Sequence, residues 1–187
     1  SQILMIYMDY IENVFDRMEN VTYLMIADSD LQENLMYLRE HYEDGKWLRV
    51  RSDISEAVNS YANMEAYFSS FILTTAFLVF GFGKANVSLD DLEPYIHVLQ
   101  DANGQIRRIS GTQQLILVRE IRQSVNLELS HLAYVVAQVD FSAIISDMEK
   151  TLKHANLPID ISVYDGDICL YASNPEQDLA GKTENVW

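Results

Sequence analysis

The chain has 187 residues, 49% of them hydrophobic, and a formal net charge of −15. This apolar content is enough for a core and excludes a disordered chain. The acidic charge leaves no basic surface for a phosphate backbone, so we expect no nucleic-acid partner. The single cysteine, Cys169, excludes an internal disulfide and leaves the compartment open.

The first third of the chain is predicted to be helical. Apolar residues at helical spacing predict one long helix over residues 2–27. Ser29 with Gln32 can form a capping box for a second helix, which Asp44 and Gly45 would end. A third helix is expected to begin near Asp53, where Glu56 completes another capping box. Its buried face would comprise Ile54, Val58, Tyr61, Ala62 and Phe68.

The middle of the chain reads as strand, helix and strand. The run FILTTAFLVF predicts one buried strand that ends at a turn of Gly81 to Gly83. Ser88 to Asp91 would cap a short helix through Leu99. Residues 105–110 form a possible short strand. With 15 residues, the apolar run from position 68 to 82 is too short for the roughly 20 residues of a membrane-spanning helix.

Two alternating strands follow, over Gln114–Arg122 and His131–Asp140, joined by a polar link that reads as a long hairpin connection. Asp140 can cap an amphipathic helix over Phe141–His154. A second hairpin is predicted at Asp165-Gly166-Asp167. Helices followed by a mostly antiparallel sheet indicate an α+β fold.

We divide the chain into an N-terminal helical segment (1–68) and a sheet-containing core (69–187). Residues 157–187 either complete this sheet or begin a second unit of the same kind. The start, Ser1 to Tyr10, has neither the basic residues nor the cleavage site of a signal peptide, so we expect a segment of a longer protein.

These features resemble a known family. The long first helix, the central sheet, the strand that ends in Val139-Asp140-Phe141 with its following helix, and the hairpin Tyr164-Asp165-Gly166-Asp167-Ile168 are similar to the extracellular PAS-like sensor domains of the Cache superfamily. Those domains occur in bacterial sensor histidine kinases and chemoreceptors. The resemblance implies a PAS-like sheet with flanking helices that cups a small ligand, in an extracellular or periplasmic domain of a membrane-anchored parent.

The family's amino-acid-binding members use an aromatic and arginine cluster followed by a Trp-Tyr pair, and this sequence has no such Arg-x-Trp-Tyr string. The resemblance therefore implies no amino-acid specificity here. The wide apolar stripe of the first helix predicts a parallel homodimer, with one side of the helix on the domain and the other on a second copy. Cross-links at Tyr7 or Val14 are the expected sign of that dimer.

The candidate ligand site is sought among the cationic side chains. In a chain this acidic they are few, and an anionic ligand would have to bind to them. Arg119 shares a strand face with Leu115, Leu117 and Ile121, where an unpaired charge is costly to bury. It is therefore either a ligand contact or a member of an internal ion pair with neighbours of Glu120 or with Asp140. The full set of candidate ligand-binding residues is Arg119, Arg107, Tyr134 and Tyr164. The expected ligand is an anionic or polyhydroxylated metabolite.

Catalysis is not expected of this segment. Cys169 with His131 or His154 could form a nucleophile and base pair, but an alternating strand accepts a small apolar residue there equally well. The histidines lack ligand spacing, and Gly81-Phe-Gly83 lacks the third glycine of a nucleotide fingerprint, so neither a metal nor a cofactor is expected. The alternatives to a sensor are a cytoplasmic regulatory or dimerisation domain without a small-molecule ligand, and a thiol enzyme built on Cys169.

Overall fold

The computed structural model describes residues 2–41, 45–83, 88–155 and 160–174. Its helices are α1 (Gln2–Ile26), α2 (Ser29–Glu40), α3 (Trp47–Ala62), α4 (Leu89–Leu99) and α5 (Phe141–His154), with a 3-10 turn η1 (Gln100–Ala102). The strands are β1 (Phe68–Thr74), β2 (Val79–Phe82), β3 (Arg107–Arg108), β4 (Leu115–Arg122), β5 (His131–Val139), β6 (Ser162–Asp165) and β7 (Ile168–Ala172). The predicted α+β class, with a long N-terminal helix, an antiparallel sheet and flanking helices, is confirmed.

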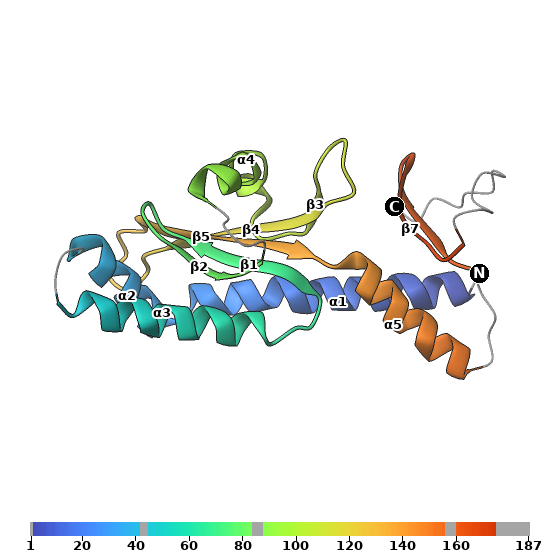
Figure 1. The fold of residues 1–187 in the computed structure, drawn as a ribbon, viewed down its shortest axis with the longest axis horizontal. Helices are drawn as coiled ribbons and strands as arrows, with labels where there is room; N and C mark the ends of the chain where they lie inside the picture. Colours follow the sequence, from blue (N-terminus) through green and yellow to red (C-terminus); the bar gives the residue numbers. More distant parts are fainter. Residues whose placement is uncertain (1, 42–44, 84–87, 156–159, 175–187) are drawn as a thin grey trace.

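Five strands form one antiparallel sheet in the order β2-β1-β5-β4-β3. The helices α1, α2 and α3 cover one face of this sheet and α4 covers the other (Figure 1). The strands β6 and β7 form a separate two-stranded sheet, which lies beside the first turns of α1. The C-terminal hairpin therefore does not extend the main sheet.

The core has two layers because the central strands alternate. Leu117 and Ile121 of β4 and Ala137 of β5 are fully buried against the helices α1 to α3. Val118 and Val136 face the opposite way and pack with α4. This alternation was predicted for both strands, and each has the predicted position and length to within two residues.

The apolar stripe of α1 is buried within this one chain. The buried members are Tyr7, Ile11, Val14, Met18, Val21 and Met25. The helix ends at Ile26, as expected for residues 2–27. The side of the stripe that the dimer prediction assigned to a second copy, including Tyr7 and Val14, thus packs on the chain's own sheet and on α3 and α5.

Two helix starts differ from the prediction. The cap of α2 is Asp28 instead of Ser29: its Oδ1 accepts from the backbone N–H of Leu31 at 3.0 Å. Gln32 is buried and bonds elsewhere, to the Ile26 carbonyl and to Ser124, so it cannot complete a capping box. The start of α3 is at Trp47, six residues before Asp53. Asp44, one of the two residues expected to end α2, lies outside the described residues.

The run read as one strand is a hairpin. β1 and β2 pair antiparallel around a turn in which the Thr75 hydroxyl accepts from the N–H groups of Phe77 and Leu78. This local bonding competes with continued strand pairing, and sequence periodicity does not register it. Phe68 lies in β1 and not in α3. Gly81 pairs with Ile72 inside β2 at φ 113°, so it is a strand residue and not a turn residue.

The remaining connections follow the prediction. Ser88 and Asp91 form the capping box of α4, and Asp140 caps α5 by accepting from Ala143 N–H at 3.1 Å. The link between β4 and β5 closes with a Gln123 to Ser130 bond of 2.8 Å. The C-terminal hairpin turns at Gly166 with φ 58°. Of the region 157–187, the described part is this hairpin, and residues 157–159 and 175–187 lie outside the described residues.

Candidate functional site

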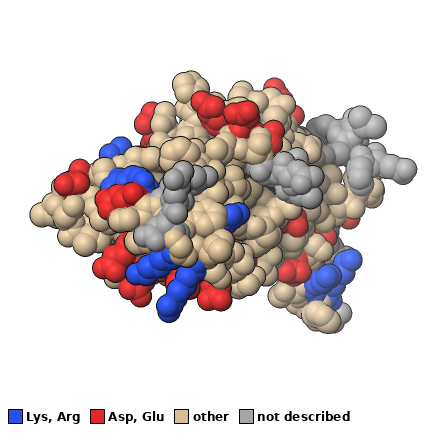
Figure 2. All heavy atoms as spheres, turned by 60° about the vertical axis from the view of Figure 1, so that its left-hand side comes forward, with Lys and Arg blue, Asp and Glu red and all other residues tan. Residues whose placement is uncertain are grey.

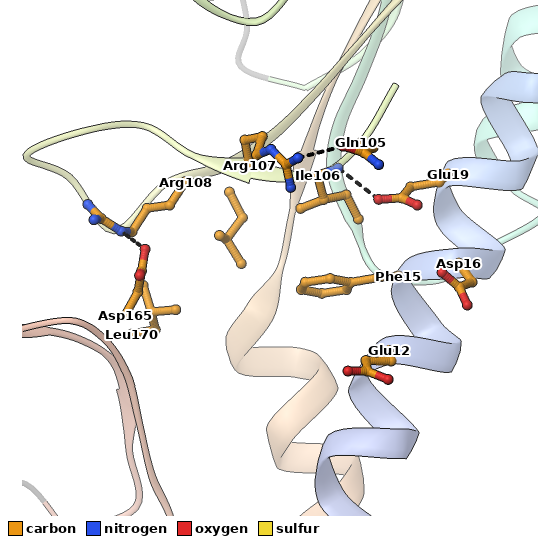
Figure 3. Close-up of a pocket in the computed structure, with 11 residues that line it drawn as sticks. Glu12, Phe15, Asp16, Glu19, Gln105, Ile106, Arg107, Arg108, Asp165 and Leu170 are labelled. Atoms are coloured by element: carbon orange, nitrogen blue, oxygen red, sulfur yellow. Dashed lines mark hydrogen bonds and ion pairs between the residues drawn. The ribbon is translucent and has the colours of Figure 1, made fainter. Parts of the chain in front are cut away.

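A cavity of about 410 Å³ lies where α1, the start of the β3–β4 pair and the C-terminal hairpin meet (Figure 3). Its lining comes from α1 (Glu12, Phe15, Asp16, Glu19), from the β3 segment and β4 (Gln105, Ile106, Arg107, Arg108, Leu115), and from the hairpin (Asp165, Leu170). The volume falls within the range of small-molecule sites, which are mostly apolar with a few placed polar groups.

Specific bonds hold the walls in place. The carboxylate of Glu19 accepts from the backbone N–H of Ile106 at 2.8 Å, which fixes the β3 segment against α1. Arg107 donates to the side-chain oxygen of Gln105, and Arg108 forms an ion pair with Asp165 of the hairpin. Both bonds are visible in Figure 3. The cavity thus has a wall held by the sheet and a wall held by the hairpin.

Two further bonds tether the hairpin. Gln113 Nε2 donates to the Cys169 carbonyl at 2.7 Å, and the Tyr171 hydroxyl donates to Glu149 of α5 at 2.9 Å. Burial, and then the bond to Glu149, raises the pKa of Tyr171 to about 12. The hydroxyl therefore stays a donor at neutral pH and links β7 to α5.

The guanidinium of Arg119 is hydrogen-bonded to groups of the same chain. Its Nε donates to the Thr22 hydroxyl at 3.1 Å, Nη2 to the Glu19 carbonyl at 3.2 Å and Nη1 to the Asn103 carbonyl at 2.9 Å. Its Cζ also lies 5.7 Å from the centroid of the Tyr23 ring. Burial lowers the pKa of Arg119, while Glu19 and Tyr23 act in the opposite direction. The partners are carbonyls and a hydroxyl, and not Asp140.

The four predicted site residues do not form one site. Arg107 lines the cavity, and Arg119, Tyr134 and Tyr164 are not among its lining residues. Tyr134 is on the α4 side of the sheet, with its hydroxyl 3.4 Å from Gln100, whereas Arg119 faces α1. Tyr164 lies on β6 and pairs with Cys169 across the hairpin. The register places Val135, and not Tyr134, opposite Arg119.

Sequence reasoning missed the α1 wall of the cavity. Glu12, Asp16 and Glu19 recur at helical spacing and are typical of the solvated face of an amphipathic helix. Phe15 is partly buried and also packs on the core, so its sequence position does not distinguish it from the apolar stripe of α1. The sequence feature that could have indicated a site is an aromatic residue next to acidic residues on one face of α1. That feature indicates a site only if the C-terminal hairpin lies over the same face.

Other chemistry is limited in the part of the chain that the structure describes. There, no three His, Cys, Asp or Glu side chains converge so that they could hold a metal ion. Among the same residues, no helix has the length and apolar character needed to cross a membrane. Figure 2 shows acidic side chains gathered at the upper edge of the molecule, over α4, and Lys and Arg scattered over the rest of this face.

Comparisons with known proteins add no assignment. The chain matches no protein-family model and no curated protein.

Proposed function

We propose that this chain is the ligand-sensing domain of a membrane-bound signal-transduction receptor, with a two-component sensor histidine kinase as the first choice of parent. The domain lies on the extracellular or periplasmic side and performs no catalysis itself. The α+β architecture supports the proposal, because a long N-terminal helix under an antiparallel sheet is what the Cache resemblance implies. Fold alone does not carry a function, so the site carries the argument.

The observation that carries the proposal is the cavity shared by α1, the sheet and the C-terminal hairpin. A small molecule there contacts all three, so binding favours one relative position of helix and hairpin over others. The start of α1 and the hairpin also lie at the same end of the molecule (Figure 1). A ligand-dependent shift at the cavity is therefore close to both ends of the described chain.

Thermal-shift screening against a metabolite library tests the proposal, with Leu170→Trp as the blocking variant. Leu170 is a partly exposed cavity residue, and an indole there fills the space that a ligand would need. Leu127→Trp is the matched control because Leu127 is 83% exposed on the β4–β5 link. We expect a metabolite that stabilises the wild type and the control but not Leu170→Trp.

Stabilisation that survives in Leu170→Trp would show that the cavity is not the ligand site. The parent gene supplies a second check: we expect apolar segments of about 20 residues on both sides of this chain. A gene without them, together with a chain that no metabolite stabilises, would favour the cytoplasmic regulatory or dimerisation domain.

A further inference from the structure

Some of the charged side chains around the cavity have a bonding partner among the described residues, and others do not. Four carboxylates and two guanidinium groups line it, an excess of two negative charges in a chain whose formal charge is −15. Asp165 and Arg108 neutralise each other, and Glu19 is bonded to Ile106 N–H. Glu12 and Asp16 have no hydrogen bond or ion pair among the described residues. The unsatisfied charge at the cavity is therefore mainly negative and belongs to α1.

The positions of these carboxylates suit a cation. Glu12 and Asp16 are four residues apart, so their charges are neighbours on α1 and repel each other. Figure 3 shows the Phe15 ring extending from the same helix to lie beneath Ile106 and above the carboxylate of Glu12. The ring also makes an edge contact with Phe141 of α5, with the centroids 6.3 Å apart. An aromatic face beside a carboxylate attracts an ammonium group through both its quadrupole and Coulomb's law. Ile106, Leu115 and Leu170 supply apolar contact for a carbon chain.

We infer that the ligand of this cavity carries a cationic nitrogen that binds at the α1 wall, between Glu12 and the Phe15 ring. This inference rests on the proposed ligand-sensing function and reverses the sign of the expected ligand, which the arginines alone had suggested to be anionic. Arg107 stands at the opposite wall, where N–H groups beyond its bond to Gln105 have no acceptor among the described residues. A ligand that also has a carboxylate at its far end can place that carboxylate beside Arg107. A ligand whose only charged groups are carboxylates would be repelled by the carboxylates of α1.

Three four-carbon probes of matched length test the charge: 1,4-diaminobutane, 4-aminobutanoate and butanedioate. Titration calorimetry on the 187-residue chain at low salt is the measurement, since salt screens such contacts. We expect the two amine-bearing probes to bind and butanedioate to bind at least about tenfold more weakly. Glu12→Gln should weaken binding of the amine probes by about tenfold, the value of one charge-assisted hydrogen bond.

The variants separate binding from folding. The double variant Glu12→Gln/Asp16→Asn removes two repelling charges, so its melting temperature should not fall while amine binding is lost. The control Asp30→Asn/Glu33→Gln makes the same charge change on the exposed side of α2 and should bind as the wild type does. If butanedioate binds best and Leu170→Trp blocks it, the sensor proposal stands and the cation inference is overturned. If none of the three probes binds, the inference is also overturned, and the metabolite screen decides the function separately.

Discussion

At the scale of single residues, Arg119 shows how a half-buried cation can direct all its hydrogen bonds to uncharged acceptors. Its guanidinium joins α1 to the η1 turn through three acceptors. Arg119→Ala should lower the free energy of unfolding by about 1 to 3 kcal/mol, because each acceptor loses a charged donor in a half-buried place. Urea unfolding measures this loss.

Arg122→Ala is the control for that prediction. Its side chain is 55% exposed and pairs with Glu120 at 3.1 Å, so its loss should cost less than about 1 kcal/mol. Equal destabilisation by the two substitutions would contradict the structural role of Arg119. Since Arg119 does not line the cavity, its replacement should leave binding of the amine probes unchanged.

The hydroxyl of Tyr61 predicts a response to alkaline pH. It donates to Asp28, the cap of α2, at 2.7 Å. Burial first, and then this bond, raises the pKa of Tyr61 to about 12 from an ordinary value of 10. Because the folded pKa is the higher one, the contribution to stability is complete below pH 10 and is lost as the pH rises toward 12. Unfolding midpoints in urea should fall over this window.

Tyr61→Phe should reduce that fall, since one of the hydroxyls that ionise only after unfolding is gone. Tyr171, whose pKa is also raised to about 12, is expected to account for part of the remainder. A profile for Tyr61→Phe that matches the wild type would show that the bond to Asp28 contributes nothing over this range.

How far single residues could be predicted depended on how local their partners are. The capping roles of Ser88, Asp91 and Asp140 were readable because donor and acceptor lie three residues apart. The alternation of side chains along β4 also predicted on which face of the sheet Arg119 lies. Its partners Thr22 and Asn103 lie 97 and 16 residues away, and no local rule identifies them.

At the scale of elements, Gly81 explains how β2 pairs so closely with β1. A Cβ on Gly81 would lie 2.0 Å from the carbonyl oxygen of Phe71, and its φ of 113° is open to glycine only. Gly81→Ala should therefore destabilise the fold by about 2 kcal/mol or more, because the two strands must separate and the backbone is strained.

Gly45→Ala is the matched control, since nothing lies within 4 Å of a Cβ there. It should change the free energy of unfolding by no more than about 0.5 kcal/mol. The measurement is urea unfolding of both variants. Similar midpoints for the two would mean that the β1–β2 pair can adjust its spacing.

The elements themselves were largely predictable because they are amphipathic. Periodicity found α1, α4, α5, β4 and β5, where one face is buried and the other is polar. It failed in two kinds of place. The β1–β2 turn is made by the Thr75 hydroxyl within an apolar run. The helix α3 begins six residues earlier than expected, and its extra residues include Val50, which continues the four-residue spacing of Ile54 and Val58.

At the scale of the whole molecule, the sequence could not place the C-terminal hairpin. It predicted the hairpin and left open whether those strands join the main sheet, because pairing partners of a short hairpin are not encoded in its alternation. The structure holds the hairpin by Arg108–Asp165, Gln113–Cys169 and Tyr171–Glu149, all between segments distant in the chain. The cavity exists only when the hairpin lies in that position. The sequence alone therefore could not predict that Glu12 and Phe15 line a cavity.

If the chain forms the predicted homodimer through its N-terminal helix, residues other than the buried apolar stripe of α1 must make the contact. Tyr7 and Val14 are buried in the chain's own core, so they cannot meet a second copy without unfolding. A seam that repeats every four and three residues remains on the outer side of α1: Ile6, Tyr10, Asn13, Arg17, Asn20 and Leu24. All of these except the partly buried Tyr10 are exposed. The ends of the seam are apolar and its middle is polar, with two asparagines and with Arg17, which pairs with Glu65 of the same chain at 2.9 Å. Asparagines at such positions suit a parallel pair of helices, because a polar seam residue fixes register.

Cysteine cross-linking in the full-length parent of the proposed sensor tests this seam, on a Cys169→Ser background. In a parallel dimer each seam residue meets its own copy, so Asn13→Cys and Asn20→Cys should form intermolecular disulfides readily. Val14→Cys, one residue away and fully buried, should not. Glu33→Cys on the exposed side of α2 controls for collision between receptors. Cross-linking at Asn13 that is no greater than at Glu33 would remove α1 as the dimer contact.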